Sequence, residues 1–124
     1  RAAAYLREHY HEPVRLQELA RKSGVSARHM ERQFKGVFGI GPHEFLVKTR
    51  VQAAARLLRD TTQTLAEIAI NCGFCDQSSL TRSFQRHMGI TPAEYRSSIW
   101  ARYRRTGRQR PSREPPPNEE FGAP

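Results

Sequence analysis

The sequence predicts an all-α protein of seven helices, in which a long linker helix joins two smaller lobes. Apolar residues recur every three or four positions through most of residues 1–103, which is the spacing of amphipathic helices. Glycines and prolines interrupt this spacing and divide it into segments. One arrangement of residues also occurs twice, about fifty residues apart. We therefore expect a first lobe at 1–41, a linker helix at 42–60 and a second lobe at 61–103.

Three short helices are predicted in the first lobe. The first ends before Pro13, because proline disfavours helical backbone in the residue that precedes it. The second ends at Gly24, since glycine readily adopts the left-handed conformation that closes many helices. Ser26 is a suitable N-cap for the third helix. The apolar stripe of that helix consists of Met30, Phe34, Val37 and Phe38.

The linker helix and the second lobe have equally clear boundaries. Pro42 at the first helical position opens the linker helix. Thr64 and Glu67 are spaced as a capping box, in which each side chain binds the other residue's backbone N–H. Asp76 caps the sixth helix, and Thr91 begins the seventh. The apolar stripe of the sixth helix consists of Leu80, Phe84, His87 and Met88.

Composition limits the classes of protein and of partner. A formal net charge of +9 indicates a polyanionic partner, with nucleic acid as the default. No apolar run approaches the length of a membrane span, and no signal peptide is visible, so we expect no membrane partner. The chain begins with Arg1 rather than Met, so we expect upstream sequence to be missing. Residues 104–124 are charged and proline-rich, which predicts a disordered tail.

The repeated arrangement can be aligned residue by residue, with one extra residue in the second turn. Matched pairs include Gly24 with Gly73, Arg32 with Arg82, Phe34 with Phe84, Pro42 with Pro92 and Phe45 with Tyr95. Each copy contains a short helix, a tight glycine turn and a longer helix, which is the helix-turn-helix layout. In that motif the second helix lies in the major groove, so the sequence predicts binding to double-stranded DNA.

Helical phase identifies the side chains that face away from the apolar stripes of the two second helices. Because arginine pairs well with guanine, we expect Arg32 and Arg82 to be the main base-reading residues. The full expected base-reading set is Arg28, Glu31, Arg32, Gln77, Ser78, Thr81 and Arg82. The residues expected to contact phosphate are Ser26, Lys35, Lys48, Gln85 and Arg86. Glu31 either accepts a hydrogen bond from cytosine N4 or pairs with Arg28.

The second copy carries the more specific motif. It consists of Ala66-Glu67-Ile68-Ala69, then Cys72-Gly73-Phe74, then residues 79–84, and finally residues 89–96. With this motif, residues 1–100 resemble the C-terminal DNA-binding domain of the AraC/XylS family of bacterial transcription regulators. The first copy matches that family more loosely, and the long charged tail departs from the family's common pattern.

The resemblance implies a mode of binding and several partners. Both recognition helices are expected to enter successive major-groove segments on one face of the duplex, roughly 34 Å apart. The resemblance also implies contact with RNA polymerase and, usually, activation of transcription in the bacterial cytoplasm, at the nucleoid. Many members carry an N-terminal domain that senses a small molecule and dimerises, and we expect such a domain to be missing from this chain. No cofactor is expected.

An enzyme and a protein-interaction module are the alternative classes. The sequence has no Walker loop, no G-x-G-x-x-G and no catalytic arrangement of serine, cysteine and histidine anchored to a recognisable turn, so we expect no enzyme. An interaction module built on paired amphipathic helices stays open. A flat salt response of DNA binding would favour the interaction module, because phosphate contacts make affinity steeply dependent on salt.

Cys72 and Cys75 form a C-x-x-C pair beside the second turn. Such a pair can be redox-active or can supply half of a zinc site. The chain has no second pair, and serines stand around the turn of the first copy. We therefore expect structural thiols, with redox sensing and metal binding as alternatives.

Overall fold

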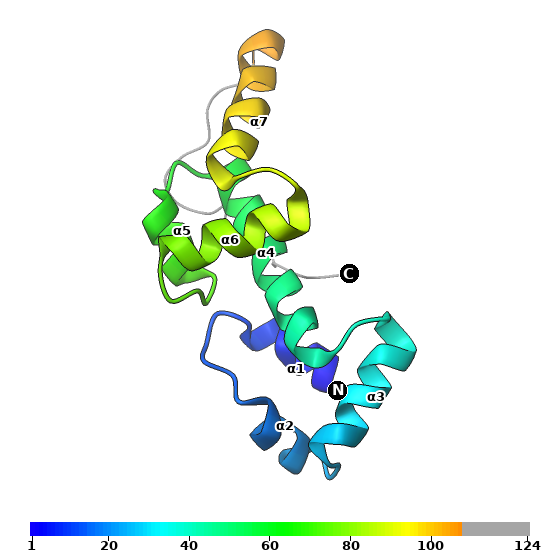
Figure 1. Ribbon diagram of the computed structural model, residues 1–124. Helices are drawn as coiled ribbons and strands as arrows, with labels where there is room; N and C mark the ends of the chain where they lie inside the picture. The colour runs from blue at the N-terminus through cyan, green and yellow to red at the C-terminus, as the bar shows by residue number, and fades with distance from the viewer. Residues whose placement is uncertain (108–124) are drawn as a thin grey trace.

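The computed structural model describes residues 1–107 and shows seven helices and no strand within this range (Figure 1). These helices are α1 (Ala2–His9), α2 (Leu16–Lys22), α3 (Ala27–Phe38), α4 (Pro42–Asp60), α5 (Leu65–Asn71), α6 (Gln77–Met88) and α7 (Pro92–Thr106). The predicted all-α fold with its long linker helix is confirmed, and the bounds of α4 are those expected from Pro42 and the apolar spacing.

Helix α4 is the scaffold of the molecule. Figure 1 shows it running between a lower group, α1 to α3, and an upper group, α5 to α7. Helices of both groups contact α4. Within residues 1–107, no helix of the lower group makes a substantial contact with a helix of the upper group. Buried alanines at Ala53 and Ala54 allow neighbouring helices to approach its middle closely. Each group is therefore packed on its own half of one shared helix.

The repeat in sequence is also a repeat in packing. The rings of Phe34 and Phe45 meet edge to face in the first lobe, with centroids 5.3 Å apart and an interplanar angle of 73°. The rings of Phe84 and Tyr95 meet in the same way in the second lobe, at 5.4 Å and 67°. Edge-to-face contact is a favourable arrangement of aromatic rings. These pairs are equivalent in the alignment, so the two lobes share one core design.

Local capping residues set the helix ends as predicted. Thr64 and Glu67 form the capping box, with the Thr64 N–H donating to Glu67 Oε1 at 2.8 Å and the Glu67 N–H donating to Thr64 Oγ at 3.1 Å. The turn glycines Gly24 and Gly73 have φ of +77° and +92°, a region that side chains with a Cβ avoid. Both helix-turn-helix turns thus depend on glycine at equivalent positions.

Two half-buried arginines bind backbone carbonyls near helix ends. Arg50 donates from Nε to the Tyr10 carbonyl at 2.7 Å and from Nη2 to the Glu12 carbonyl at 2.9 Å. Arg96 donates from Nε to the Leu58 carbonyl at 3.1 Å and from Nη2 to the Thr61 carbonyl at 3.0 Å. Carbonyls in the last turn of a helix lack partners within the helix, so a guanidinium stabilises them.

The ends of the two predicted apolar stripes are not buried. Val37 is 75% exposed and Phe38 is 38% exposed at the end of α3, and Met88 is exposed and His87 half-buried at the end of α6. Val37 lines an open groove between α3 and the start of α1. The α1 side chains there are alanines, which are too small to cover it. The stripes therefore predict core positions only as far as a neighbouring helix reaches.

Helix α7 extends beyond the predicted boundary at residue 103. It continues to Thr106, and the Tyr103 hydroxyl donates to the Arg59 carbonyl of α4 at 3.2 Å. Residues 104–106, expected in the tail, are therefore helical. Gly107 is the C-cap of α7, and residues 108–124 of the predicted tail lie outside the described residues. Within residues 1–107, no helix has the combination of length and apolar character that crossing a membrane requires.

Candidate nucleic-acid interface

Helices α3 and α6 present the predicted base-reading residues on their outward faces. Met30 and Phe34 of α3, and Leu80 and Phe84 of α6, are buried in the two lobe cores. Outside these buried stripes, every member of the base-reading set is exposed except Thr81, which is half-buried. The orientation inferred from helical phase is thus the orientation in the structure.

The outward face of α3 is cationic but contains one local ion pair. Arg28 and Arg32 are exposed, and neither forms a hydrogen bond or ion pair with another described residue. The Lys35 ammonium lies 3.5 Å from Glu31 Oε1, one turn away on the same helix. Of the two expectations for Glu31, pairing with Arg28 is therefore wrong, because its partner is Lys35. The carboxylate offsets the charge of Lys35 and leaves the two arginines as the available cations.

The outward face of α6 is less charged. Arg82 Nη2 lies 3.4 Å from the Ser79 hydroxyl oxygen, a long contact that leaves most of the guanidinium free to bind elsewhere. Gln77 and Ser78 stand in the first turn, both exposed. The first two turns of this face therefore offer one cation, Arg82, among neutral hydrogen-bonding groups, and the second arginine of α6, Arg86, lies in the last turn.

The N-caps of the two recognition helices differ in charge. The Ser26 hydroxyl accepts the His29 N–H at 3.0 Å, and its own O–H can still donate to a phosphate oxygen. Asp76 occupies the equivalent position in α6 and accepts the Ser79 N–H at 2.8 Å. That hydrogen bond holds the pKa of Asp76 below its ordinary value, so the carboxylate stays ionised. The N-terminus of α6 is therefore less favourable for phosphate than that of α3.

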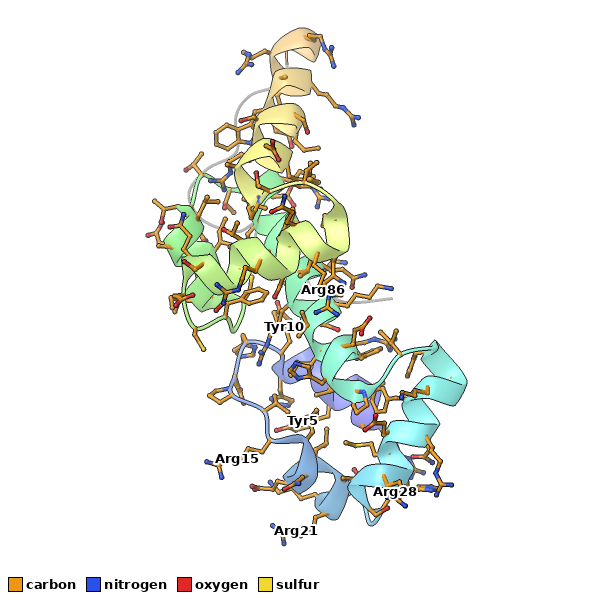
Figure 2. All side chains as sticks on the ribbon, viewed as in Figure 1. Tyr5, Tyr10, Arg15, Arg21, Arg28 and Arg86 are labelled. Atoms are coloured by element: carbon orange, nitrogen blue, oxygen red, sulfur yellow. The ribbon has the colours of Figure 1, made fainter. Side chains whose placement is uncertain are left out.

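The remaining predicted phosphate contacts are exposed cations or amides. Lys48 lies on α4, and Gln85 and Arg86 lie in the second half of α6. Figure 2 shows Arg86 on the side of α6 that faces the first lobe. The structure leaves all of these side chains accessible to a duplex.

Two further cations of the first lobe were missed by the sequence reasoning. Figure 2 shows Arg15 and Arg21 projecting outward from the α2 region, at the same end of the lobe as Arg28. Both are exposed. Helical phase was applied only to the second helix of each unit, whereas the first helix of a helix-turn-helix unit crosses the DNA backbone. The helical phase of α2 places Arg21 opposite the buried Leu19, whereas Arg15 is the N-cap of α2 and its outward position follows only from the structure.

Of the C-x-x-C pair, Cys72 has the environment of a structural thiol. Cys72 is buried, and this burial raises the pKa of its thiol to about 12, so it is protonated at neutral pH. A protonated thiol is a poor nucleophile and a poor metal ligand. Cys75 is exposed. Among residues 1–107, no three histidine, cysteine or acidic side chains are grouped so as to hold a metal ion.

Known proteins share both the sequence pattern and the fold. A family model described as a helix-turn-helix domain matches residues 19–98. An HTH-type transcriptional regulator of Mycobacterium tuberculosis is 38% identical over 85 residues, which are 68% of this chain and 33% of that regulator. The chain thus spans about a third of the length of this relative.

Two solved structures extend the comparison to three dimensions. The DNA-binding domain of AdpA, a global transcriptional factor solved in complex with a target DNA, has a TM-score of 0.77 and 35% identity, and the match covers 82% of this chain and 91% of that one. A transcriptional regulator with an AraC-type DNA-binding domain from Chromobacterium violaceum has a TM-score of 0.74 and 30% identity, covering 79% and 88%. The seven-helix fold, its two helix-turn-helix units and these matches show that the chain belongs to the AraC-type helix-turn-helix family of DNA-binding transcription regulators.

Proposed function

We propose that the chain binds a bipartite DNA site, with α3 and α6 in successive major-groove segments and with different bases contacted by each helix. The observation that carries this proposal is the pair of equivalent outward faces on α3 and α6, each opposite a buried stripe. The AdpA domain, which is similar over most of the chain, was solved on DNA, and this supports the same partner here.

The base contacts follow from donor and acceptor geometry. Arg32 and Arg82 occupy equivalent positions, and each can donate two hydrogen bonds to guanine O6 and N7. Arg28, Glu31, Gln77, Ser78 and Thr81 complete the base-reading set. Glu31 can accept from cytosine N4 while Lys35 shields it from phosphate.

The phosphate contacts position the protein on the duplex. Ser26, Lys35, Lys48, Gln85 and Arg86 are the residues proposed for this role, and Arg15 and Arg21 extend it along the first lobe. The first two turns of α3 carry two free arginines behind a neutral cap, whereas those of α6 carry one arginine behind an acidic cap, so the first lobe supplies more of the sequence-independent affinity. The preferred site of one chain is then non-palindromic.

One selection experiment tests this proposal directly. Duplexes carrying a random segment are incubated with the protein, and the bound fraction is sequenced. The expected result is two different half-sites about one helical turn apart. A single enriched half-site would contradict simultaneous binding by both units, and the absence of any enriched sequence would contradict base-specific binding. A titration at several salt concentrations separates DNA binding from the interaction-module alternative, which predicts a flat response.

Within a longer regulator, we propose that this chain delivers an effector-sensing domain to its promoter and activates transcription through RNA polymerase. Membership of the AraC-type family of transcription regulators supports this proposal. Transcription from a template with the selected site upstream of a promoter measures it. Increased transcript would support activation, and decreased transcript would instead indicate repression.

A further inference from the structure

The two lobes meet at a second place besides the shared helix α4. The end of α1, the middle of α4 and the turn between α5 and α6 come together around Arg50. We refer to Tyr10, Glu12, Arg50 and Gly73 as the interlobe joint. Two of its members belong to the first lobe, one to the linker helix and one to the second lobe.

Arg50 connects the linker helix to the first lobe across 40 positions of sequence. Its guanidinium donates to the carbonyls of Tyr10 and Glu12, at 2.7 Å and 2.9 Å. Burial lowers the pKa of Arg50, but arginine remains charged at any physiological pH. A half-buried cation requires such partners, because an unpaired one would lose its hydration without compensation. The end of α1 is therefore held against the middle of α4.

Gly73 brings the second lobe onto the same point. A Cβ placed on Gly73 would collide with the Tyr10 carbonyl oxygen and would lie 2.7 Å from Arg50 Nε. The backbone of the α5–α6 turn therefore lies directly against the hydrogen bond between Arg50 and Tyr10. The residues on either side of Gly73, Cys72 and Phe74, are buried in the core, and their packing fixes the position of this turn.

The equivalent glycine of the first lobe has no such neighbour. Gly24 has the same left-handed backbone as Gly73, but nothing lies within 4 Å of the position its Cβ would take. The close approach at Gly73 is therefore not a requirement of the helix-turn-helix turn itself. It belongs to the contact between the lobes.

From this geometry, and resting on the proposed bipartite binding, we infer that Arg50 is a positioning residue that sets the half-site spacing at which both units bind. When two binding units are linked, the affinity gained from the second depends on how well their geometry matches the two sites. The interlobe joint holds the second helix-turn-helix unit at one angle to the first. Loss of the joint leaves each unit intact and makes their relative angle variable.

The test uses duplexes in which the two selected half-sites are separated by different numbers of base pairs, together with duplexes holding one half-site. Arg50→Met keeps an unbranched apolar side chain that reaches about as far as Nε and removes the guanidinium donors, whereas Arg50→Lys restores a positively charged donor group. We expect Arg50→Met to bind each single half-site like the unmodified protein, to lose about tenfold on the best bipartite duplex and to flatten the spacing preference. Arg50→Lys should recover part of that preference.

Gly73→Ala and Gly24→Ala form a matched pair of second variants. Both place a Cβ on a left-handed residue and carry a similar backbone cost. Only the new Cβ of Gly73→Ala would collide with atoms of the interlobe joint, so only this variant should alter the spacing preference. The inference is overturned if the two glycine variants have the same spacing profile, or if Arg50→Met loses as much on single half-sites as on bipartite ones.

A measurement without DNA separates this inference from the proposed function. Residual dipolar couplings of backbone N–H groups report the relative orientation of the two lobes in solution. A single alignment tensor should fit the couplings of both lobes in the unmodified protein, whereas each lobe of Arg50→Met should need its own tensor. A single alignment in both proteins would overturn the inference even if bipartite DNA binding holds. Failure of the unmodified protein to prefer any spacing would instead count against the proposed function.

Discussion

Glu31 places its carboxylate 3.5 Å from the ammonium of Lys35, one turn along the exposed face of α3. The pair lies among the side chains proposed to meet the duplex, so a negative charge stands within a cationic surface. Exposed pairs of this kind contribute little to folding stability. Its importance is for recognition, because the carboxylate both limits phosphate attraction and offers a hydrogen-bond acceptor.

Glu31→Gln should strengthen binding to random DNA and weaken the preference for one base pair of the selected site. The first effect follows from freeing Lys35, which should steepen the salt dependence by up to about one unit of slope. The second follows from losing a carboxylate acceptor for cytosine N4. Titrations on random and selected duplexes measure both effects.

Glu18→Gln is the matched control, because Glu18 pairs with Lys22 at 3.7 Å in the same one-turn arrangement on α2. It changes the net charge equally but should leave base preference intact. Loss of base preference in both variants would show that Glu31 does not contact a base.

Arg32→Ala and Arg82→Ala should each reduce the free energy of binding to the selected site by roughly 1–3 kcal/mol and relax preference at one or two base pairs. Lys48→Ala, by contrast, should weaken binding to all sequences alike. Affinity measurements on a panel of single-base-pair variants of the site distinguish these patterns. Equal losses of the arginine variants on random DNA would identify Arg32 and Arg82 as phosphate contacts.

The two lobes should contribute unequally to sequence-independent affinity. Arg28 and Ser78 stand at equivalent positions of α3 and α6, and both are exposed. Arg28→Ala should lower affinity for random DNA and reduce the salt slope by about one unit, because a cation is lost. Ser78→Ala should change neither. Electrophoretic shifts at two salt concentrations suffice, and equal effects of the two variants would contradict the asymmetry.

Asp76→Asn should raise affinity for random DNA while preserving the α6 cap, since asparagine also caps helices well. Because the Ser79 N–H depresses the pKa of Asp76, its carboxylate stabilises the folded state above the ordinary aspartate pKa. That contribution is lost as the pH falls through the lower folded-state pKa. The variant should therefore lose less of its melting temperature on acidification.

Glu94→Gln is the control for Asp76→Asn. The pKa of Glu94 is lowered for the same reason, by the N–H of Thr91 in the α7 capping box. Its replacement should reduce the acid sensitivity of melting without any effect on DNA. Unchanged DNA affinity in Asp76→Asn would mean that the α6 N-terminus lies away from phosphate.

Phe84→Ala should lower the free energy of unfolding by about 3–5 kcal/mol, because this fully buried ring is packed against Tyr95. Val37→Ala should change it by no more than about 0.5 kcal/mol, since Val37 is largely exposed. Chemical denaturation measures both. A large loss for Val37→Ala would indicate that the groove between α1 and α3 closes in solution.

Most helix boundaries could be predicted because the residues that cap a helix are its sequence neighbours. Ser26, Thr64, Asp76 and Thr91 each accept a backbone N–H three residues later, as their positions indicated. The outward faces of α3 and α6 were predictable for a related reason, since the helical period relates every side chain to the buried stripe. The ion-pair partner of Glu31 was not predictable in this way. Arg28 and Lys35 both lie within one turn of Glu31, so the side-chain conformations determine which of them forms the pair.

The sequence alone determined that this chain is two copies of one helix-turn-helix unit on a shared helix, since periodicity, caps and turn glycines are local properties. The tertiary structure decided how far each stripe is covered, because Val37 is buried or exposed according to what α1 places beside it. The tertiary structure also determined which residues form the interlobe joint. Arg50 lies among the apolar positions of α4, but its carbonyl partners are about forty residues away in sequence. Only the folded chain brings them together with Gly73, and that contact makes one copy of the repeat different from the other.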